Sequence, residues 1–250
     1  MKQVITIASR IDNIDVDLFT PDNWDEKKLI ICCHGFNSGK DSPTYVGIGN
    51  KLLANGIAYA IFSLPYHAGR RGDHSDFTVE NCIEDIDKVE QMLRDRFPNT
   101  KIGILATSFG GYLTLLRLHK TEHNYFAIIL KSPAIKMDEI LKNIIGKEGF
   151  EFFKNQGFVI NDMKEPHMRI NFSFYEELAN NRVFDNPLYD EKILIYHGMV
   201  DDTAPYKDSV EFANLNPNTT LVSYENENHR FSEEILDQFS IEVAEYCKKL

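Results

Sequence analysis

The sequence has no apolar run long enough to cross a membrane, few cysteines, and more negative than positive charge. Its 250 residues include four cysteines and one tryptophan, and 38 acidic against 27 basic side chains give a formal net charge of −11. A membrane-spanning helix needs about 18 consecutive apolar residues, and an acidic chain repels the phosphates of nucleic acids. We therefore expect a globular protein that binds neither membranes nor nucleic acid.

The cysteines indicate reduced thiols rather than disulfides. Cys32 and Cys33 are adjacent, where a bond between neighbours would be strained, and no Cys-x-x-Cys pair is present. Residues 1–7 alternate polar and apolar side chains, whereas a signal peptide needs an apolar run of about 7–15 residues. These features favour a cytoplasmic location.

Short apolar runs alternate with longer segments of helical period. Residues 29–33 predict a strand that is buried on both faces, and residues 79–97 predict a helix that ends at Pro98. Further strands are expected at residues 57–64, 102–106, 126–130, 193–196 and 221–224, and further helices after Pro43, Ser108, Pro205 and Phe231. This order predicts one α/β domain with a mostly parallel sheet and helices on both faces. The stricter alternation at residues 3–9 and 14–19 predicts an antiparallel hairpin at one edge.

One long segment interrupts this alternation. Residues 134–186 contain no clear strand pattern and are rich in aromatic side chains. Long insertions are usually functional when they are ordered. We interpret residues 134–186 as a small helical cap, and residues 1–133 and 187–250 as the core of the fold. The aromatic side chains form either the cap's own small core or a pocket for an acyl or aryl group.

A candidate nucleophile follows the strand predicted at residues 102–106. Ser108 lies between this strand and a helix, with the small residues Ala106 and Gly110 two positions away on either side. A nucleophilic serine on a sharp strand-to-helix turn needs small neighbours at these positions. Gly35 and Phe36 also follow a strand, and we expect the backbone N–H groups of Phe36 and Phe109 to bind an oxyanion.

Candidate partners for the serine follow two later strands. Asp201 and Asp202 come after the strand at residues 193–196, and His229 comes after the strand at residues 221–224. A carboxylate in the first loop can orient a histidine in the second. Serine, aspartate and histidine then occur in the chain order expected of this hydrolase architecture. Because all of them follow strand ends, they should meet at one edge of the sheet.

These motifs resemble the α/β-hydrolase superfamily over nearly the whole chain. Within it, the sequence is most similar to small bacterial serine esterases of the feruloyl or cinnamoyl esterase type. The strings that carry the resemblance are His34-Gly35-Phe36, Ser108-Phe109-Gly110-Gly111, His197-Gly198 with Asp201 and Pro205, His229-Arg230-Phe231, and residues 76–81. The resemblance implies that Asp201 rather than Asp202 is the catalytic acid, and that the cap is inserted after the sixth strand.

We therefore expect a serine esterase that acts on a small-molecule ester of a small or aromatic acyl group without a cofactor. Ser108 would be the nucleophile, His229 the base and Asp201 the acid. Residues 108–115 are also similar to the nucleophile turn of prolyl-oligopeptidase-type peptidases, so a peptidase is one alternative and a thioesterase another. A hydrolase-like protein that only binds a ligand is an alternative of a different class.

Two further patterns in the sequence also have simpler explanations. His119, Glu122 and His123 match the zinc-peptidase pattern HxxEH, but histidines at the end of a helix also interact favourably with the helix dipole. No further ligands are identified, so we expect no metal ion. Arg70 and Arg71 occupy a loop near the predicted site, where they either attract an acidic substrate or remain solvated.

Overall fold

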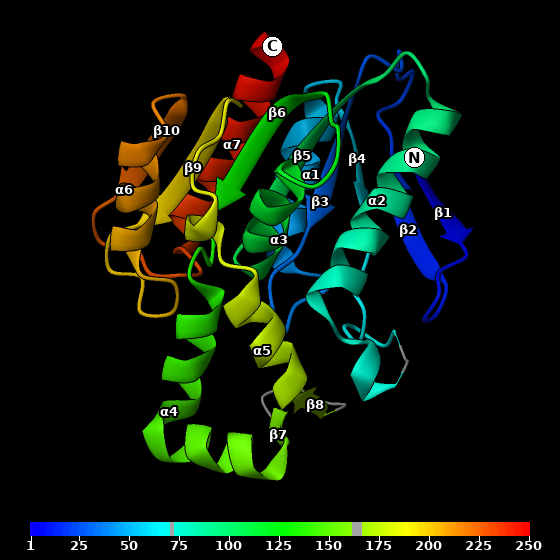
Figure 1. Cartoon of the computed structure of the whole chain (residues 1–250). Coiled ribbons are helices and arrows are strands. Elements are labelled where there is room, and N and C mark those ends of the chain that lie inside the picture. Colours follow the sequence, from blue (N-terminus) through cyan, green and yellow to red (C-terminus); the bar gives the residue numbers. More distant parts are fainter. Residues whose placement is uncertain (71–72, 162–166) are drawn as a thin grey trace.

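The computed structural model describes residues 1–70, 73–161 and 167–250. An eight-stranded sheet crosses the centre of the molecule (Figure 1). In spatial order its strands are β1 (Lys2–Ile7), β2 (Ile14–Phe19), β4 (Ala58–Ile61), β3 (Lys28–Cys33), β5 (Lys101–Thr107), β6 (Tyr125–Lys131), β9 (Ile193–Gly198) and β10 (Thr219–Tyr224). Strands β1 and β2 form an antiparallel hairpin at one edge, and the strands from β4 to β10 pair in parallel. The predicted mostly parallel sheet with an edge hairpin is confirmed.

Helices cover both faces of the sheet because its central strands are apolar on both sides. In β3, Leu29, Ile31 and Cys33 belong to one core cluster, whereas Ile30 and Cys32 belong to the other. This alternation follows from the two-residue period of a strand. Helices α2 (Val79–Arg96), α3 (Phe109–Leu118) and α6 (Tyr206–Leu215) supply residues to the first cluster, and α1 (Pro43–Ala54) and α7 (Glu233–Lys249) supply residues to the second.

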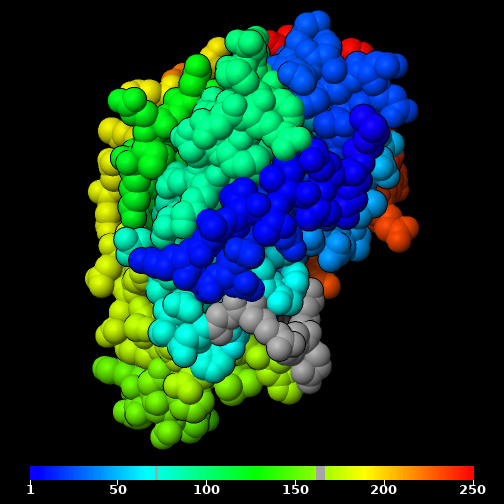
Figure 2. Space-filling model, turned by 90° about the vertical axis from the view of Figure 1, so that its right-hand side faces the viewer, coloured from blue at the N-terminus to red at the C-terminus, as the bar shows by residue number. Residues whose placement is uncertain are grey.

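Helix α2 has the bounds that its sequence pattern predicts, to within one residue. The hydroxyl oxygen of Thr78 accepts a hydrogen bond from the N–H of Asn81 and caps the first turn. The helix ends at Arg96, two residues before Pro98, where a proline disfavours helical geometry in the residue before it. Figure 2 shows α2 beside the N-terminal hairpin, and the Arg96 side chain donates a hydrogen bond to Gln3 there.

The insertion between β6 and β9 contains a hairpin as well as helices. Its elements are α4 (Met137–Gln156), β7 (Phe158–Asn161), β8 (Met168–Asn171), α5 (Phe172–Asn180) and the short helix η2 (Val183–Asp185). The expectation that this segment lacks strands is therefore wrong. Each strand of the hairpin has four residues, and so short a strand carries too few repeats for a clear alternating pattern. The other expectation, an insertion after the sixth strand, is confirmed.

The cap, residues 134–186, lies beyond the carboxyl ends of the strands, and α4 bends sharply within it (Figure 1). The bend is at Gly146, whose φ of 75° places it in the left-handed region that glycine tolerates. Aromatic rings pack against one another inside the cap, with centroids 4.7 Å apart for Phe150 and Tyr175 and 5.0 Å apart for Phe153 and Phe172. The division of the chain into core and cap units at residues 134 and 186 stays a prediction.

All four cysteines are free and buried. Among the helices in the described ranges, none has both the length and the apolar character that crossing a bilayer requires.

Candidate active site

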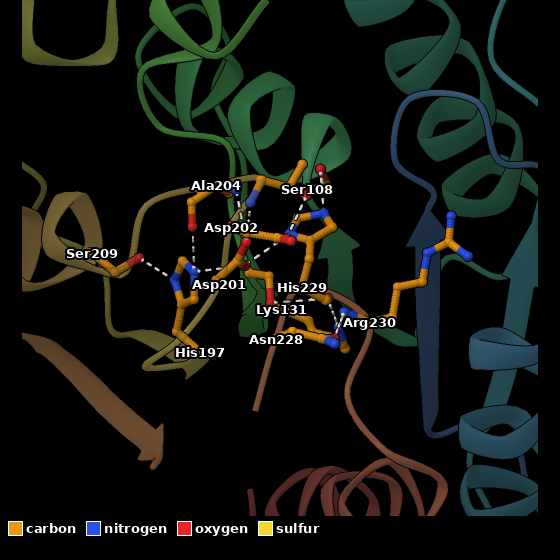
Figure 3. Close-up of polar contacts among 12 residues, drawn as sticks. Ser108, Lys131, His197, Asp201, Asp202, Ala204, Ser209, Asn228, His229 and Arg230 are labelled. Carbon is orange, nitrogen blue, oxygen red and sulfur yellow. Dashed lines mark hydrogen bonds and ion pairs between the residues drawn. The ribbon is translucent and has the colours of Figure 1, made fainter. Parts of the chain in front are cut away.

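Three side chains from different strand ends form one chain of hydrogen bonds (Figure 3). Ser108 follows β5, Asp201 follows β9 and His229 follows β10. The Nε2 atom of His229 lies 3.0 Å from Oγ of Ser108, and its Nδ1 atom lies 2.8 Å from Oδ2 of Asp201. The structure thus brings together the three residues that the sequence analysis selected, across 121 residues of chain from Ser108 to His229.

Ser108 occupies a strained turn that presents its hydroxyl group. Its φ of 52° and ψ of −116° lie outside the regions that a serine normally adopts, and such strain is typical of a nucleophile between strand and helix. The turn needs small neighbours. A Cβ atom on Gly110 would lie 2.7 Å from the carbonyl oxygen of His34, and one on Gly35 would lie 2.9 Å from Cβ of Ser108.

Asp201 is the carboxylate that orients His229. Its side chain is 0% exposed, and its Oδ1 atom accepts hydrogen bonds from the N–H groups of Thr203 at 2.9 Å and Ala204 at 2.8 Å. Burial alone would raise the pKa of Asp201, but the hydrogen bonds from His197 and His229 outweigh it, and the pKa lies well below its ordinary value. Asp201 is therefore a carboxylate over the whole physiological range of pH.

Asp202 is placed differently, although it is the next residue. It is exposed, and its Oδ1 atom accepts a hydrogen bond from the hydroxyl group of Thr203 at 3.2 Å. The geometry therefore agrees with the choice of Asp201 that the family resemblance implies.

A second histidine, to which the sequence analysis assigned no role, also binds Asp201. His197 is fully buried, and its Nε2 atom lies 3.0 Å from both Oδ2 of Asp201 and the carbonyl oxygen of Ala204. Since both of these atoms are acceptors, Nε2 carries the proton, and Nδ1 is left to accept a hydrogen bond from Oγ of Ser209 at 2.8 Å. His197 thereby fixes the carboxylate that orients His229. The family resemblance includes the His197-Gly198 string, but nothing in the sequence indicates that the side chain of His197 contacts Asp201.

The predicted oxyanion donors lie beside Ser108. Phe109 is the first residue of α3, and the rings of Phe36 and Phe109 are 5.9 Å apart. The backbone hydrogen bonds within residues 1–70, 73–161 and 167–250 give the N–H groups of Phe36 and Phe109 no protein acceptor. Nearby, Nε2 of His34 accepts a hydrogen bond from the N–H of Leu64 at 2.9 Å, so His34 holds the turn that carries Phe36. The oxyanion role of the two N–H groups stays a prediction.

The other candidate patterns have separate structural partners. His119 binds the carbonyl oxygen of Asn186 at 2.9 Å, and His123 binds the carboxylate of Glu191 at 2.8 Å. In the part of the chain that the structure describes, no group of three histidine, cysteine or acidic side chains is placed to hold a metal ion. Arg70 forms a buried ion pair with Asp85. The expectation that Arg70 either attracts a substrate or remains solvated is therefore wrong. Arg71 lies outside the described residues.

Solved structures with the same architecture include several hydrolases. Est1E from Butyrivibrio proteoclasticus, in a structure with ferulic acid bound, has a TM-score of 0.84 and 22% identity, with 98% of this chain and 100% of that chain covered. Alpha/beta hydrolase domain-containing protein 10 from mouse has a TM-score of 0.81 and 17% identity, with 99% of each chain covered. An esterase from Exiguobacterium antarcticum has a TM-score of 0.72 and 18% identity, with 99% and 100% covered. The fold is therefore that of the α/β hydrolases.

Comparison of sequences adds a family assignment. No curated protein matches the chain. A family model described as serine aminopeptidase, S33, matches residues 25–151, a range that includes the Phe36 turn and Ser108. Because this match spans just over half of the sequence, the chain belongs to the serine aminopeptidase S33 family of hydrolases.

Proposed function

We propose that the chain is a serine esterase that cleaves carboxylic esters of small or aromatic acyl groups through an acyl-enzyme. The observation that carries this proposal is the chain of hydrogen bonds from Asp201 through His229 to Ser108. A serine hydroxyl is a weak nucleophile by itself, and an adjacent oriented base is the arrangement that activates it.

In the first half of the reaction, Oγ of Ser108 attacks the ester carbonyl carbon and its proton passes to Nε2 of His229. The N–H groups of Phe36 and Phe109 stabilise the oxyanion, and Asp201 stabilises the imidazolium. The bond to the alcohol oxygen then breaks, and the alcohol leaves with the proton from His229. In the second half, water attacks the acyl-enzyme by the same route and releases the acid and free Ser108. These steps need no cofactor or metal ion.

Two observations support an ester with a small or aromatic acyl group. Aromatic rings pack beside the proposed oxyanion turn, with the ring of Phe174 6.3 Å from that of Phe36 and 6.0 Å from that of Phe109. Phe109 and Phe174 are buried, and Phe36 is the partly exposed ring of these three. Aromatic surfaces of this kind favour flat apolar groups. The structure of Est1E holds ferulic acid in the same fold. We accordingly propose a feruloyl-esterase-like preference, and a small-molecule substrate in the cytoplasm.

An aminopeptidase is the second candidate, and the family description favours it. The two reactions share the acyl-enzyme and differ in the leaving group. An amine leaves less readily than an alcohol and requires proton transfer from His229 as the bond breaks. Ser108, His229 and Asp201 would serve as nucleophile, base and acid in either reaction.

The test is a comparison of kcat/KM for three substrate types: a p-nitrophenyl ester of a short acid, methyl ferulate, and aminoacyl p-nitroanilides. We expect the esters to exceed the anilides by about 100-fold or more, and Ser108→Ala to abolish their hydrolysis. Faster cleavage of the anilides would favour the aminopeptidase. A folded protein that cleaves none of them would favour a ligand-binding role.

A further inference from the structure

A lysine lies directly behind the proposed active site. Lys131 is the last residue of β6 and is 4% exposed. Its Nζ atom donates a hydrogen bond to the backbone carbonyl oxygen of His229 at 2.7 Å (Figure 3). A buried lysine is uncommon, because burial of a charge is costly unless the charge is well paired. This position therefore calls for an explanation.

The loop that carries His229 closes around the ammonium group. The Nζ atom of Lys131 lies 3.8 Å from the centre of the Phe231 ring, within the range of a favourable cation–π contact. Phe231 has a φ of 64° and is 8% exposed, so the chain turns sharply to bring this ring inward. The Oγ atom of Ser132 also approaches the carbonyl oxygen of His229, at 3.4 Å. The side chain of Lys131 thus contacts both His229 and Phe231, two residues further along the same loop.

The backbone of Lys131 holds the other reacting residue. Its carbonyl oxygen accepts a hydrogen bond from the N–H of Ser108 at 3.0 Å. The carbonyl oxygen of Ser108 in turn accepts from the N–H of Ala134 at 3.0 Å. Lys131 therefore binds the serine through its backbone and the histidine through its side chain, so it influences the separation of Nε2 and Oγ.

The ammonium group also has an electrostatic position in the site. Burial lowers the pKa of Lys131 to about 8, while the charges of Asp201 and Glu227 oppose that shift. The side chain consequently remains mostly protonated at pH 7. The titratable groups that face it are Asp201 from the loop after β9, and Glu227 and His229 from the loop after β10. A cation here stabilises the Asp201 carboxylate.

We propose that Lys131 is a positioning residue for the proposed esterase reaction, which holds the His229 loop at the distance that Ser108 requires. This proposal rests on the proposed function. It concerns the side chain of Lys131 alone, because the backbone contact to Ser108 persists in any variant.

The test compares Lys131→Met, Lys131→Arg and a matched control, Lys28→Met, using kcat and KM of ester hydrolysis. Lys28 makes similar contacts at the opposite end of the sheet: its Nζ atom donates to the carbonyl oxygens of Cys247 and Lys248 and lies 5.8 Å from the ring of Phe126. We expect Lys131→Met to lower kcat by about 10- to 100-fold with little change in KM. Lys131→Arg should recover much of the lost kcat, because a guanidinium can also donate to the carbonyl oxygen of His229. Lys28→Met should match the wild type.

Three results would overturn the proposal while the wild type hydrolyses esters. One is a folded Lys131→Met variant with wild-type kcat. Another is an equal loss of kcat in Lys131→Met and Lys28→Met, which indicates a purely structural lysine. If Lys131→Met does not fold, Lys131→Gln replaces it, and a wild-type kcat in that variant is the third. Absence of ester hydrolysis by the wild type would instead count against the proposed function.

Discussion

The site at the strand ends and the cap that lies beyond it are held by different kinds of contact. Around Ser108, Asp201 and His229 the polar groups are hydrogen-bonded from several loops, so each has a defined position. In the cap, aromatic rings pack against one another. Single hydrogen bonds join it to the core, such as those from Asn161 to Asn37 at 2.7 Å and from the N–H of Val79 to the carboxylate of Glu177 at 2.7 Å. Apolar packing tolerates repacking better than a buried polar network does.

This difference predicts separate effects of substitution in the two regions. We expect substitutions of Ser108, His229 and Asp201 to lower kcat most, because these are the reacting groups of the proposed mechanism. We expect substitutions of buried rings in the cap to lower stability most, because each leaves a cavity.

The largest effect is expected at the nucleophile and the base. Ser108→Ala and His229→Ala should each lower kcat by roughly 10⁴- to 10⁶-fold, and the double variant should be little worse, because the residues act as a unit. Steady-state ester hydrolysis measures this, with thermal unfolding as the control for folding. If the losses of the two variants multiply, Ser108 and His229 act independently and the account fails.

The neighbouring aspartates provide a sharper comparison within the strand ends. Asp201→Asn should lower kcat by roughly 10³- to 10⁴-fold, because an amide cannot hold His229 in the required tautomer. Asp202→Asn should stay within a few-fold of the wild type, because Asp202 is exposed and contacts Thr203. Steady-state ester hydrolysis gives kcat for both variants. A larger loss in Asp202→Asn than in Asp201→Asn, with both variants folded, would show that Asp202 is the catalytic acid.

In the cap, the expected effect is on stability. Phe174 is 1% exposed and its ring lies 4.3 Å from that of Phe77 in the core. Phe174→Ala should lower the free energy of unfolding by about 3–5 kcal/mol, whereas Phe152→Ala, at a residue that is 59% exposed, should change it by less than about 0.5 kcal/mol. Urea unfolding measures both values. Equal effects would show that Phe174 does not join the cap to the core.

The smallest effect is the contribution of Asp201 to the pH dependence of stability. Its folded-state pKa lies well below its ordinary value because His197 and His229 hydrogen-bond to the carboxylate, so the folded protein binds fewer protons there than the unfolded chain. The stabilisation is therefore present above about pH 4 and is lost as the pH falls towards the folded-state value. The difference in unfolding free energy between wild type and Asp201→Asn should shrink below pH 4. A constant difference would indicate an ordinary carboxyl group.

Much of the sheet follows from local sequence pattern, because strands that are buried on both faces appear as short apolar runs. Strand β2 has its predicted bounds, and α2 ends one residue before its prediction. The hairpin of β7 and β8 was missed because four-residue strands give no reliable periodicity. Strand β4 ends at Ile61 although its apolar run continues to Leu64, since burial alone does not require ladder hydrogen bonds.

Some residues of the site could be predicted from the sequence, and others could not. Ser108, Asp201 and His229 lie within recognisable motifs at strand ends, and their chain order identifies them as a set. His197 belongs to a motif that implies no role for its side chain, and Lys131 belongs to none. The contacts of Lys131 are with a backbone atom and a ring far away in the chain. Lysine at the end of an apolar strand normally predicts solvent exposure, and only the fold places the loop of His229 over it.

The central claim is that Ser108 is an activated nucleophile, and covalent labelling tests it most directly. The wild type and Ser108→Ala would be treated with a fluorophosphonate probe, and their intact masses compared. The account predicts a single adduct on the wild type and none on Ser108→Ala. An unlabelled, folded wild type, or an adduct that persists in Ser108→Ala, would contradict it.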